Sequence, residues 1–291
     1  MQSVNPYRAW IEELVIHQQR GARLPLGFAA AAPTPRDINA DAKVLLFSPH
    51  PDDECIVGGL PLRLQREQQA HIINVVVTLG SKVDRREARW AEVSMAAAAL
   101  GFDVEQPPGG AMEAVRPDIR TEAPERWDRW VQAVVKLLNT HRPFAVCLPH
   151  AADGHATHQG VHALVMDALN ACPDLVCWII ETEFWAPMQH PNVMVEIAPD
   201  LLADLVAALT CHEGEVRRNP YHLRLPAWMQ DNVRRGAELL GGQGAAAPEF
   251  LFATLYRCWH RTTGPAAALP IGSPFIKAAD SLEWLVRPPT P

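Results

Sequence analysis

The sequence predicts an α/β fold of the Rossmann-like kind, with a mainly parallel sheet and helices on both of its faces. Short runs of apolar and β-branched residues recur along the chain, and stretches with the apolar spacing of amphipathic helices separate them. Such runs are apolar at nearly every position, which is typical of strands buried on both faces of a sheet. The chain has 291 residues, 48% of them apolar, so it can bury a sizeable core.

The alternation of strands and helices begins at residue 43. Strands are expected where a short apolar run stands between turn residues: residues 43–47, 72–79, 144–148, 175–180, 193–197 and 250–256. Helices are expected where apolar residues recur every three or four positions: residues 54–69, 85–100, 124–140, 158–170, 199–211 and 227–240. Gly101 stops the second helix, and Trp127 and Trp130 stand three positions apart in the third.

Three regions follow from this pattern. Residues 1–42 contain a helical pattern and a Pro/Ala-rich connection at 29–35, and we expect them to form an arm packed on the domain. Residues 43–260 form the expected domain. Residues 261–291 are rich in proline and are expected to form a loosely wrapped tail.

The composition argues against two classes of partner. The net charge is −7 and no basic run occurs, so nucleic acid is not expected. No apolar run approaches the ~20 residues of a membrane helix, and the N-terminus lacks the pattern of a signal peptide. Six cysteines without a C-x-x-C pair predict reduced core thiols. We therefore expect a soluble, cytoplasmic protein without a membrane partner, and the sequence leaves open whether it is a homo-oligomer.

Ionisable residues concentrate directly after the first expected strand, in the stretch His50, Pro51, Asp52, Asp53 and Glu54. A proline on each side of the histidine restricts the backbone that carries these groups. Four ionisable side chains at the end of a buried strand are costly unless a positive charge lies among them, and a divalent cation is the simplest candidate. Histidine and aspartate suit zinc, whose catalytic sites take three protein ligands and keep one position open.

A second group follows the strand expected at 144–148. Four histidines and one aspartate fall within thirteen residues there: His150, Asp153, His155, His158 and His162. His155 and His158 are three positions apart at the first turn of an expected helix, so both can face the same side. The N–H groups at the start of that helix would favour anionic intermediates.

Each group alone has a simpler interpretation. A histidine-rich segment is often a solvated turn, and acidic residues often occupy the first turn of a helix. Both groups, however, follow strands of one expected parallel sheet, and the carboxyl ends of such strands meet at the same edge. This coincidence favours a metal site over the simpler interpretations.

These residues resemble the motifs of the PIG-L / LmbE-like family of zinc-dependent N-deacetylases. Residues 50–54 are similar to its H-P-D-D-E signature, and residues 153–158 to its H-x-D-H motif. The helix that contains Arg89 resembles the family's R-x-x-E-x-x-x-A-x-x-x-L-G helix, and residues 248–250 resemble its late A-E-x-F. The resemblance spans roughly residues 43–256.

The resemblance implies a division of roles. His50, Asp53 and His158 become the metal ligands, and Asp52 becomes the general base. His155 becomes the group that stabilises the oxyanion or protonates the leaving amine. The implied cofactor is Zn²⁺, with Fe²⁺ and Mn²⁺ as alternatives, because affinities for such sites differ less than cellular availability does.

Two further residues are assigned to substrate contact, Arg89 and Asp153. Trp185 is expected either to stack on a sugar ring or to be buried in the core.

Two positions depart from the family pattern. Thr157 stands where the second motif usually has aspartate, which predicts a lower pKa and a looser orientation for His155 unless Asp153 substitutes. Gly214 and Glu215 stand where the family tends to have Ser-Gln, which bears on substrate specificity.

The implied function is removal of the N-acetyl group from an N-acetylglucosamine-type amino sugar or its conjugate, a small-molecule substrate. Two alternatives stay open: an amidase for a sugar-linked acyl group other than acetate, and a metal-binding or scaffold protein without activity. A receiver-type signalling module would leave the histidine cluster unexplained. A dinucleotide enzyme is disfavoured because no G-x-G-x-x-G follows the first strand.

Overall fold

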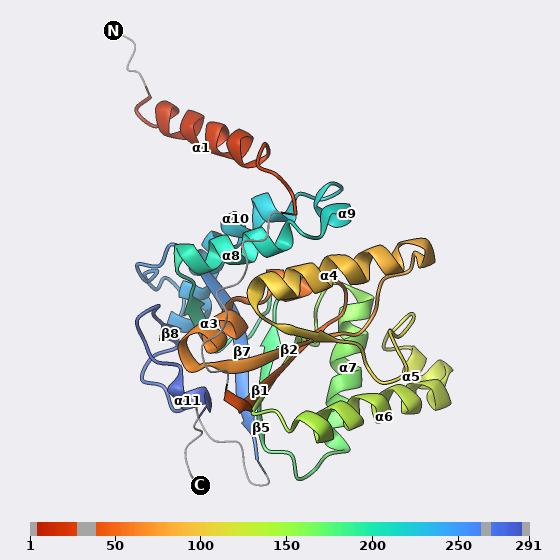
Figure 1. Ribbon diagram of the computed structural model, residues 1–291. Helices are drawn as coiled ribbons and strands as arrows, with labels where there is room; N and C mark the ends of the chain where they lie inside the picture. The colour runs from red at the N-terminus through yellow and green to blue at the C-terminus, as the bar shows by residue number, and fades with distance from the viewer. Residues whose placement is uncertain (1–4, 28–38, 263–268, 287–291) are drawn as a thin grey trace.

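In the described part of the chain, one eight-stranded sheet organises the computed structural model, in the order β3-β2-β1-β4-β5-β7-β6-β8 (Figure 1). The structure describes residues 5–27, 39–262 and 269–286, so the connection expected at 29–35 lies outside the described residues. The strands are β1 (Asn39–Ser48), β2 (Ala70–Val76), β3 (Asp103–Glu105), β4 (Ala145–Pro149), β5 (Cys177–Thr182), β6 (Val193–Glu196), β7 (Ala253–Arg261) and β8 (Phe275–Ile276).

The first five strands, β1 to β5, are parallel to one another. β7 runs antiparallel to both β5 and β6. The expected α/β fold with a mainly parallel sheet is therefore confirmed, and the antiparallel strand lies in the half of the sheet away from β1. Within the parallel half, the carboxyl ends of β2, β1, β4 and β5 lie side by side, which is where such sheets place their sites.

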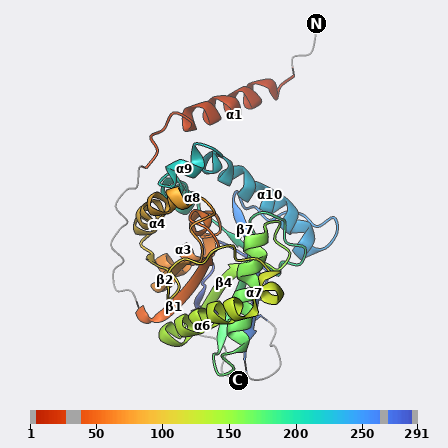
Figure 2. The same cartoon turned by 90° about the vertical axis from the view of Figure 1, so that its right-hand side faces the viewer.

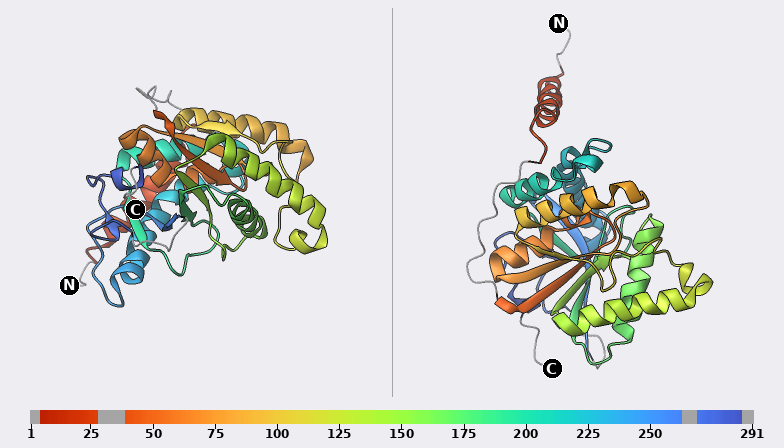
Figure 3. Two further views of the ribbon diagram at one scale, coloured as in Figure 1. Left: turned by 90° about the horizontal axis from the view of Figure 1, so that it is seen from below. Right: turned by 45° about the vertical axis from the view of Figure 1, so that its right-hand side comes forward.

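Helices cover both faces of this sheet (Figure 2, Figure 3). Side chains alternate across β1, so Val44 and Leu46 join one core, while Leu45 and Phe47 join the core on the opposite face. The first core packs against α3 (Gly59–Gln68), α4 (Arg86–Leu100), α8 (Pro199–Leu209) and α10 (Tyr221–Gly241). The second packs against α5 (Ile119–Glu122), α6 (Pro124–His141) and α7 (Ala156–Asn170).

The helix expected at 54–69 is two helices in the structure, α2 (Asp53–Ile56) and α3. The break falls at Gly58, where a Cβ would lie 2.1 Å from the Glu54 carbonyl oxygen, so only glycine fits the close approach of the two segments. By contrast, α4 ends as expected, with Gly101 in the left-handed region at a φ of 74°. A short 3-10 turn, η1 (Val83–Arg85), precedes α4.

The N-terminal helix packs less closely on the domain than expected, although Gln18 donates to the Leu223 carbonyl oxygen at 3.5 Å and Leu26, after the helix, packs against the first core. Helix α1 (Arg8–Gly21) contains no buried residue, and Figure 1 shows it projecting from the body of the molecule. Its apolar side chains, including Trp10 at 58% and Leu14 at 47% exposure, remain in contact with solvent. None of the helices in the described residues is long and apolar enough to cross a lipid bilayer.

The C-terminal region is more ordered than the expected loose tail. β8 pairs with β6 and extends the sheet. Helix α11 (Glu283–Val286) follows, and the side chains of Leu282 and Leu285 are fully buried in the first core. Composition misled the prediction, because two buried leucines outweigh the prolines around them.

Candidate metal centre and active site

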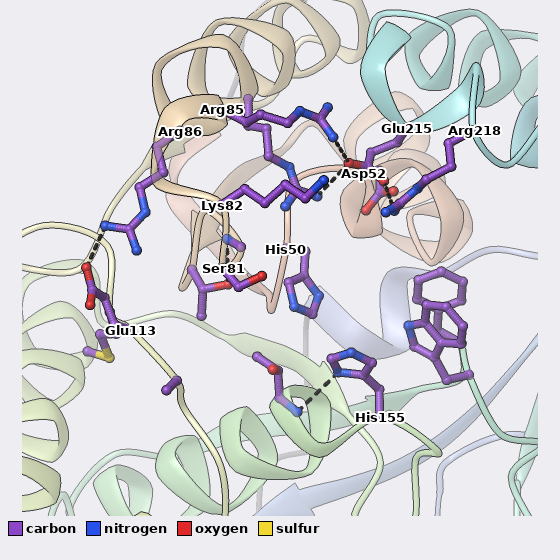
Figure 4. Close-up of a pocket in the computed structure, with 18 of the residues that line it drawn as sticks. His50, Asp52, Ser81, Lys82, Arg85, Arg86, Glu113, His155, Glu215 and Arg218 are labelled. Atoms are coloured by element: carbon purple, nitrogen blue, oxygen red, sulfur yellow. Dashed lines mark hydrogen bonds and ion pairs between the residues drawn. The ribbon is translucent and has the colours of Figure 1, made fainter.

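A pocket of about 450 Å³ opens at the carboxyl ends of the parallel strands (Figure 4). This volume is within the usual range for small-molecule sites. The residues that line it follow four neighbouring strands: His50 and Asp52 after β1, Thr78 after β2, His155 after β4, and Trp185 after β5. The sheet topology thus brings together the two motifs, which are about a hundred residues apart in sequence.

The three expected metal ligands lie close together beside this pocket, which His50 lines. His158 Nε2 lies 3.6 Å from Asp53 Oδ1, and His50 Nδ1 lies 3.8 Å from Asp53 Oδ2. The backbone N–H of His50 also donates to Asp53 Oδ2 at 2.7 Å, which holds the motif in a tight turn. These spacings leave the three side chains around a common centre.

The chemistry of this cluster fits a cation. Asp53 Oδ1 and both ring nitrogens of His158 are buried without a hydrogen-bond partner among the described residues. Burial raises the pKa of Asp53 to about 6, despite opposing contributions from His158 and from the His50 amide. Burial, followed by the nearby His158 and His155, lowers the pKa of His50 well below its usual value, so its ring is neutral and keeps a lone pair. Buried oxygen and nitrogen atoms without hydrogen-bond partners are suitable ligand atoms for a divalent ion.

His155 lies beside this cluster. Ring nitrogens of His50, His155 and His158 all lie within 4.8 Å of one another. The backbone N–H of Thr157 donates to His155 Nδ1 at 3.2 Å, so a neutral ring carries its proton on Nε2. The pKa of His155 is lowered by burial and by His158, in the expected direction. The expected loose orientation is not found, because the backbone of Thr157 holds the ring without a carboxylate.

Asp52 faces the pocket from a strained backbone. Its φ is 107°, which is uncommon for a residue other than glycine. Burial raises the pKa of Asp52 well above its usual value, and Asp53 and Glu54 raise it further. A cation among these carboxylates would oppose that shift.

A buried hydrogen-bonded pair, Glu54 and His212, fixes the strained turn. Glu54 Oε2 accepts the Asp52 backbone N–H at 3.0 Å, and Glu54 Oε1 accepts from His212 Nε2 at 2.6 Å. Both side chains of the Glu54–His212 pair are fully buried. Burial acts to raise the pKa of Glu54, but the charge and hydrogen bond of His212 outweigh it, so the net pKa is lowered. No local pattern pointed to His212, which lies 158 residues away from Glu54.

Asp153 does not contact the pocket, so its expected role in substrate contact is corrected. It is fully buried. Its Oδ1 accepts the His155 backbone N–H at 3.0 Å, and its Oδ2 lies 3.5 Å from His158 Nδ1. This carboxylate orients both histidines from behind, as carboxylates commonly do for metal-ligating imidazoles.

Arg89 lines the pocket, where it belongs to an arginine cluster around one buried carboxylate. Glu215 Oε1 lies 3.1 Å from Arg85 Nη1 and 3.5 Å from Arg89 Nη2, and Arg218 donates to Glu215 Oε2. The side chain of Glu215 is only 4% exposed. Glu92, in the same sequence motif as Arg89, instead accepts the backbone N–H of Gly214 at 3.0 Å.

The pocket wall contains other groups that the sequence did not single out. Lys82 and Arg86 line it from the segment after β2, and Arg86 donates to Glu113. Tyr221 lines it from α10. Trp185, expected either in the core or on a sugar, is 49% exposed, and its ring lies 5.5 Å from that of His155. Core burial is therefore wrong for Trp185.

Part of the chain is similar to a known protein family. Residues 45–169 match the model of the PIG-L family, described as GlcNAc-PI de-N-acetylase. This segment contains both motifs and the strands that carry them. Residues 45–169 are therefore similar to a PIG-L domain.

One curated protein to which this chain is similar is the 1D-myo-inositol 2-acetamido-2-deoxy-alpha-D-glucopyranoside deacetylase of Mycolicibacterium smegmatis. The two are 25% identical over 169 residues, which cover 49% of this chain. The match spans 58% of the relative, so rather more than half of its length corresponds to this chain.

Solved structures share the fold of this chain at low sequence identity. A conserved protein of Thermus thermophilus has a TM-score of 0.56 at 18% identity, covering 78% of this chain and 97% of the other. The N,N'-diacetylchitobiose deacetylase of Pyrococcus horikoshii has a TM-score of 0.54 at 14% identity, covering 89% and 94%. The 4-carboxy-2-hydroxymuconate hydratase of Pseudomonas putida has a TM-score of 0.57 at 16% identity, covering 79% and 100%.

Proposed function

We propose that this chain is a metal-dependent deacetylase that removes the acetyl group from an N-acetylated amino sugar or its conjugate. The observation that carries the proposal is the convergence of His50, Asp53 and His158 around a common centre, with Asp52 facing the same pocket. The names of the family and of the mycobacterial relative agree with this activity. Acetate and a free amine would be the products.

The proposed metal is zinc, held by His50, Asp53 and His158. The chemistry that such an ion supplies when bound is polarisation of the amide carbonyl and a water of lowered pKa. Iron or manganese would suit the same mixed nitrogen and oxygen ligands, and geometry alone does not choose among them.

The residues of the chain divide the remaining work. Asp52 takes the proton of the attacking water and returns it to the amine as the C–N bond breaks. The Glu54 carboxylate holds the Asp52 backbone, so this base does not have to be ordered at each turnover. His155 donates its Nε2–H to the carbonyl oxygen as that oxygen becomes negative, since the Thr157 N–H already occupies Nδ1.

The direct test measures acetate release from a panel of N-acetylated amino sugars and their glycosides. We expect the purified chain to release acetate. This activity should fall after chelation and return when zinc, iron or manganese is added. Asp52→Asn should lower kcat by about 10²–10⁴, because it removes the general base. The matched control is Asp231→Asn on α10, whose side chain is 47% exposed and outside the pocket.

Two results would contradict the proposal. One is an Asp52→Asn variant as active as the Asp231→Asn control. The other is a metal-loaded chain that releases no acetate from any member of the panel. Release of a longer acyl group without acetate would instead support the alternative of an amidase for other sugar-linked acyl groups.

The cationic wall of the pocket favours a second candidate, addition of water to an unsaturated polycarboxylate. The structural relative from Pseudomonas putida is named as a hydratase of a carboxylated muconate. Lys82 and the arginines around Glu215 would suit such a substrate. Loss of the ultraviolet absorbance of an unsaturated dicarboxylate, without acetate release from any sugar, would favour this candidate.

A further inference from the structure

The pocket carries more positive charge than its own carboxylates neutralise. Five cationic side chains line it, and only three carboxylates do so. The cations are Lys82, Arg85, Arg86, Arg89 and Arg218, and the carboxylates are Asp52, Glu113 and Glu215. The chain as a whole has a net charge of −7, so this surplus is local. A concave site with a surplus of one sign of charge concentrates ligands of the opposite sign.

The arginines are held in place by the fold. Glu215 is buried and pairs with Arg85, Arg89 and Arg218 at once. Two glycines make room for two of these side chains. A Cβ at Gly214 would lie 2.0 Å from Arg85 Nη2, and a Cβ at Gly80 would lie 2.1 Å from Arg89 Nη1.

This arrangement accounts for the departure of residues 214 and 215 from Ser-Gln. A serine at 214 would place its Cβ in the position of the Arg85 guanidinium. A glutamine at 215 would lack the charge that gathers the three arginines. Gly214 and Glu215 therefore act together on Arg85: the glycine leaves room for its guanidinium and the glutamate pairs with it.

Lys82 and Arg86 complete the cationic wall of the pocket. Among residues 5–27, 39–262 and 269–286, no carboxylate lies within 4.0 Å of the Lys82 ammonium. Within the same ranges Arg86 is paired only with Glu113, whose side chain is 65% exposed, so a ligand can replace this partner at small cost. Figure 4 shows Lys82 and Arg86 on one side of the pocket, with His50 and His155 facing the same space.

We propose that Lys82, Arg85 and Arg86 form a subsite for an oxyanion, a carboxylate or a phosphate, carried by the substrate at a distance from its N-acyl group. This inference rests on the proposed function, since it places the acyl group at the metal cluster and the anion at the cationic wall. The preferred substrate is then an anionic N-acylated amino sugar, and neutral N-acetylglucosamine is a poor one. Arginine and lysine bind such groups through charge-assisted hydrogen bonds.

The test measures binding in an Asp52→Asn background, so that no substrate is consumed and the result does not depend on turnover. Three sugars are compared by calorimetry: the methyl glycoside of N-acetylglucosamine, its carboxymethyl glycoside and N-acetylglucosamine 1-phosphate. At least one of the anionic sugars should bind about tenfold or more tightly than the neutral one. This preference should shrink as salt is raised from low to physiological ionic strength.

Two kinds of variant connect the preference to the wall. Lys82→Met and Arg86→Met should each remove most of the preference while leaving binding of the methyl glycoside within about twofold. Gly214→Ala keeps every charge but would displace Arg85, and should also weaken only the anionic sugars. Arg234→Met is the control, because this arginine is 69% exposed on α10 and outside the pocket.

The outcomes separate the sources of the anion and the two proposals. Preference for the phosphate alone or for the carboxylate alone identifies the group, and preference for both supports a general oxyanion subsite. Equal binding of all three sugars would overturn the subsite, as would a Lys82→Met or Arg86→Met variant that keeps the full preference. A clear anion preference in a chain that releases no acetate would retain the subsite and reject the deacetylase.

Discussion

At the scale of single residues, the two histidines of the second motif are three positions apart but have different surroundings. His158 is 2% exposed, and both of its ring nitrogens lack hydrogen-bond partners among the described residues. His155 lines the pocket and is oriented by the Thr157 N–H. In the proposed reaction, His158 would bind the metal and His155 would contact the reacting amide.

We expect His155→Ala to lower kcat by about 10²–10³ with the metal content unchanged, because the variant loses a donor to the developing oxyanion. His158→Ala should lose the metal, because a ligand is removed. Metal content is measured by elemental analysis and kcat by acetate release. His190→Ala, at an exposed position, is the control. A His155→Ala variant that loses its metal would reverse the two roles.

Thr157 stands where the second motif usually has an aspartate, and its backbone takes over part of the role of that aspartate. Its backbone N–H orients His155, so the family's usual aspartate is not needed for that purpose. Asp153 supplies the nearby negative charge from a buried position, 3.5 Å from His158 Nδ1. The departure at 157 thus leaves the geometry of the second motif intact, which weakens the case for an inactive scaffold.

At the scale of elements, the two ends of the chain contrast in how they pack. Leu285 on α11 is fully buried against the sheet, whereas Leu14 on α1 is 47% exposed. Apolar burial, rather than the presence of a helix, decides how much each element stabilises the domain. Helix α1 alone is also short enough to be marginal in water.

This contrast predicts the effects of a matched pair of substitutions. Leu285→Ala should lower the free energy of unfolding by about 2–5 kcal/mol, because it leaves a cavity in the core. Leu14→Ala should change it by less than about 0.5 kcal/mol, because the side chain is already in solvent. Urea denaturation followed by circular dichroism measures both. Equal effects would show that α1 packs on the domain after all.

At the scale of the whole molecule, the cysteines show how far the core is closed to solvent. All six are free and buried: Cys55, Cys147, Cys172, Cys177, Cys211 and Cys258. Burial raises the pKa of every one of these thiols, to about 12 for Cys147 and Cys177. They are spread over both faces of the sheet, so they sample the entire core.

We expect a thiol reagent at pH 8 to label none of the six in the folded chain and all six in denaturant. A raised folded pKa means that the unfolded chain releases these protons first as pH rises. Stability should therefore be unaffected below the ordinary thiol pKa and fall as pH rises above about 9. Ellman titration measures the labelling, and denaturation at pH 7 and pH 10 measures the stability. Rapid labelling of several thiols in the folded chain would contradict the closed core.

Local patterns in the sequence determined the alternation of strands and helices, the parallel half of the sheet and the two motifs at its edge. These features depend on neighbouring residues, since apolar periodicity and ligand spacing can be read within a few turns of chain. The pattern did not separate α2 from α3, because the break depends on the contact of Gly58 with the Glu54 carbonyl. It also missed β3 and β8, which are three and two residues long.

Only the tertiary structure decided which groups meet. The pairing of Glu54 with His212, and that of Arg85 and Arg89 with Glu215, join residues more than a hundred positions apart. Asp153 is buried behind the histidines, whereas Trp185 is exposed at the pocket. Sequence specifies which side chains can bind a cation or an anion, but charge pairing and solvent exclusion depend on distances that exist only after the chain has folded.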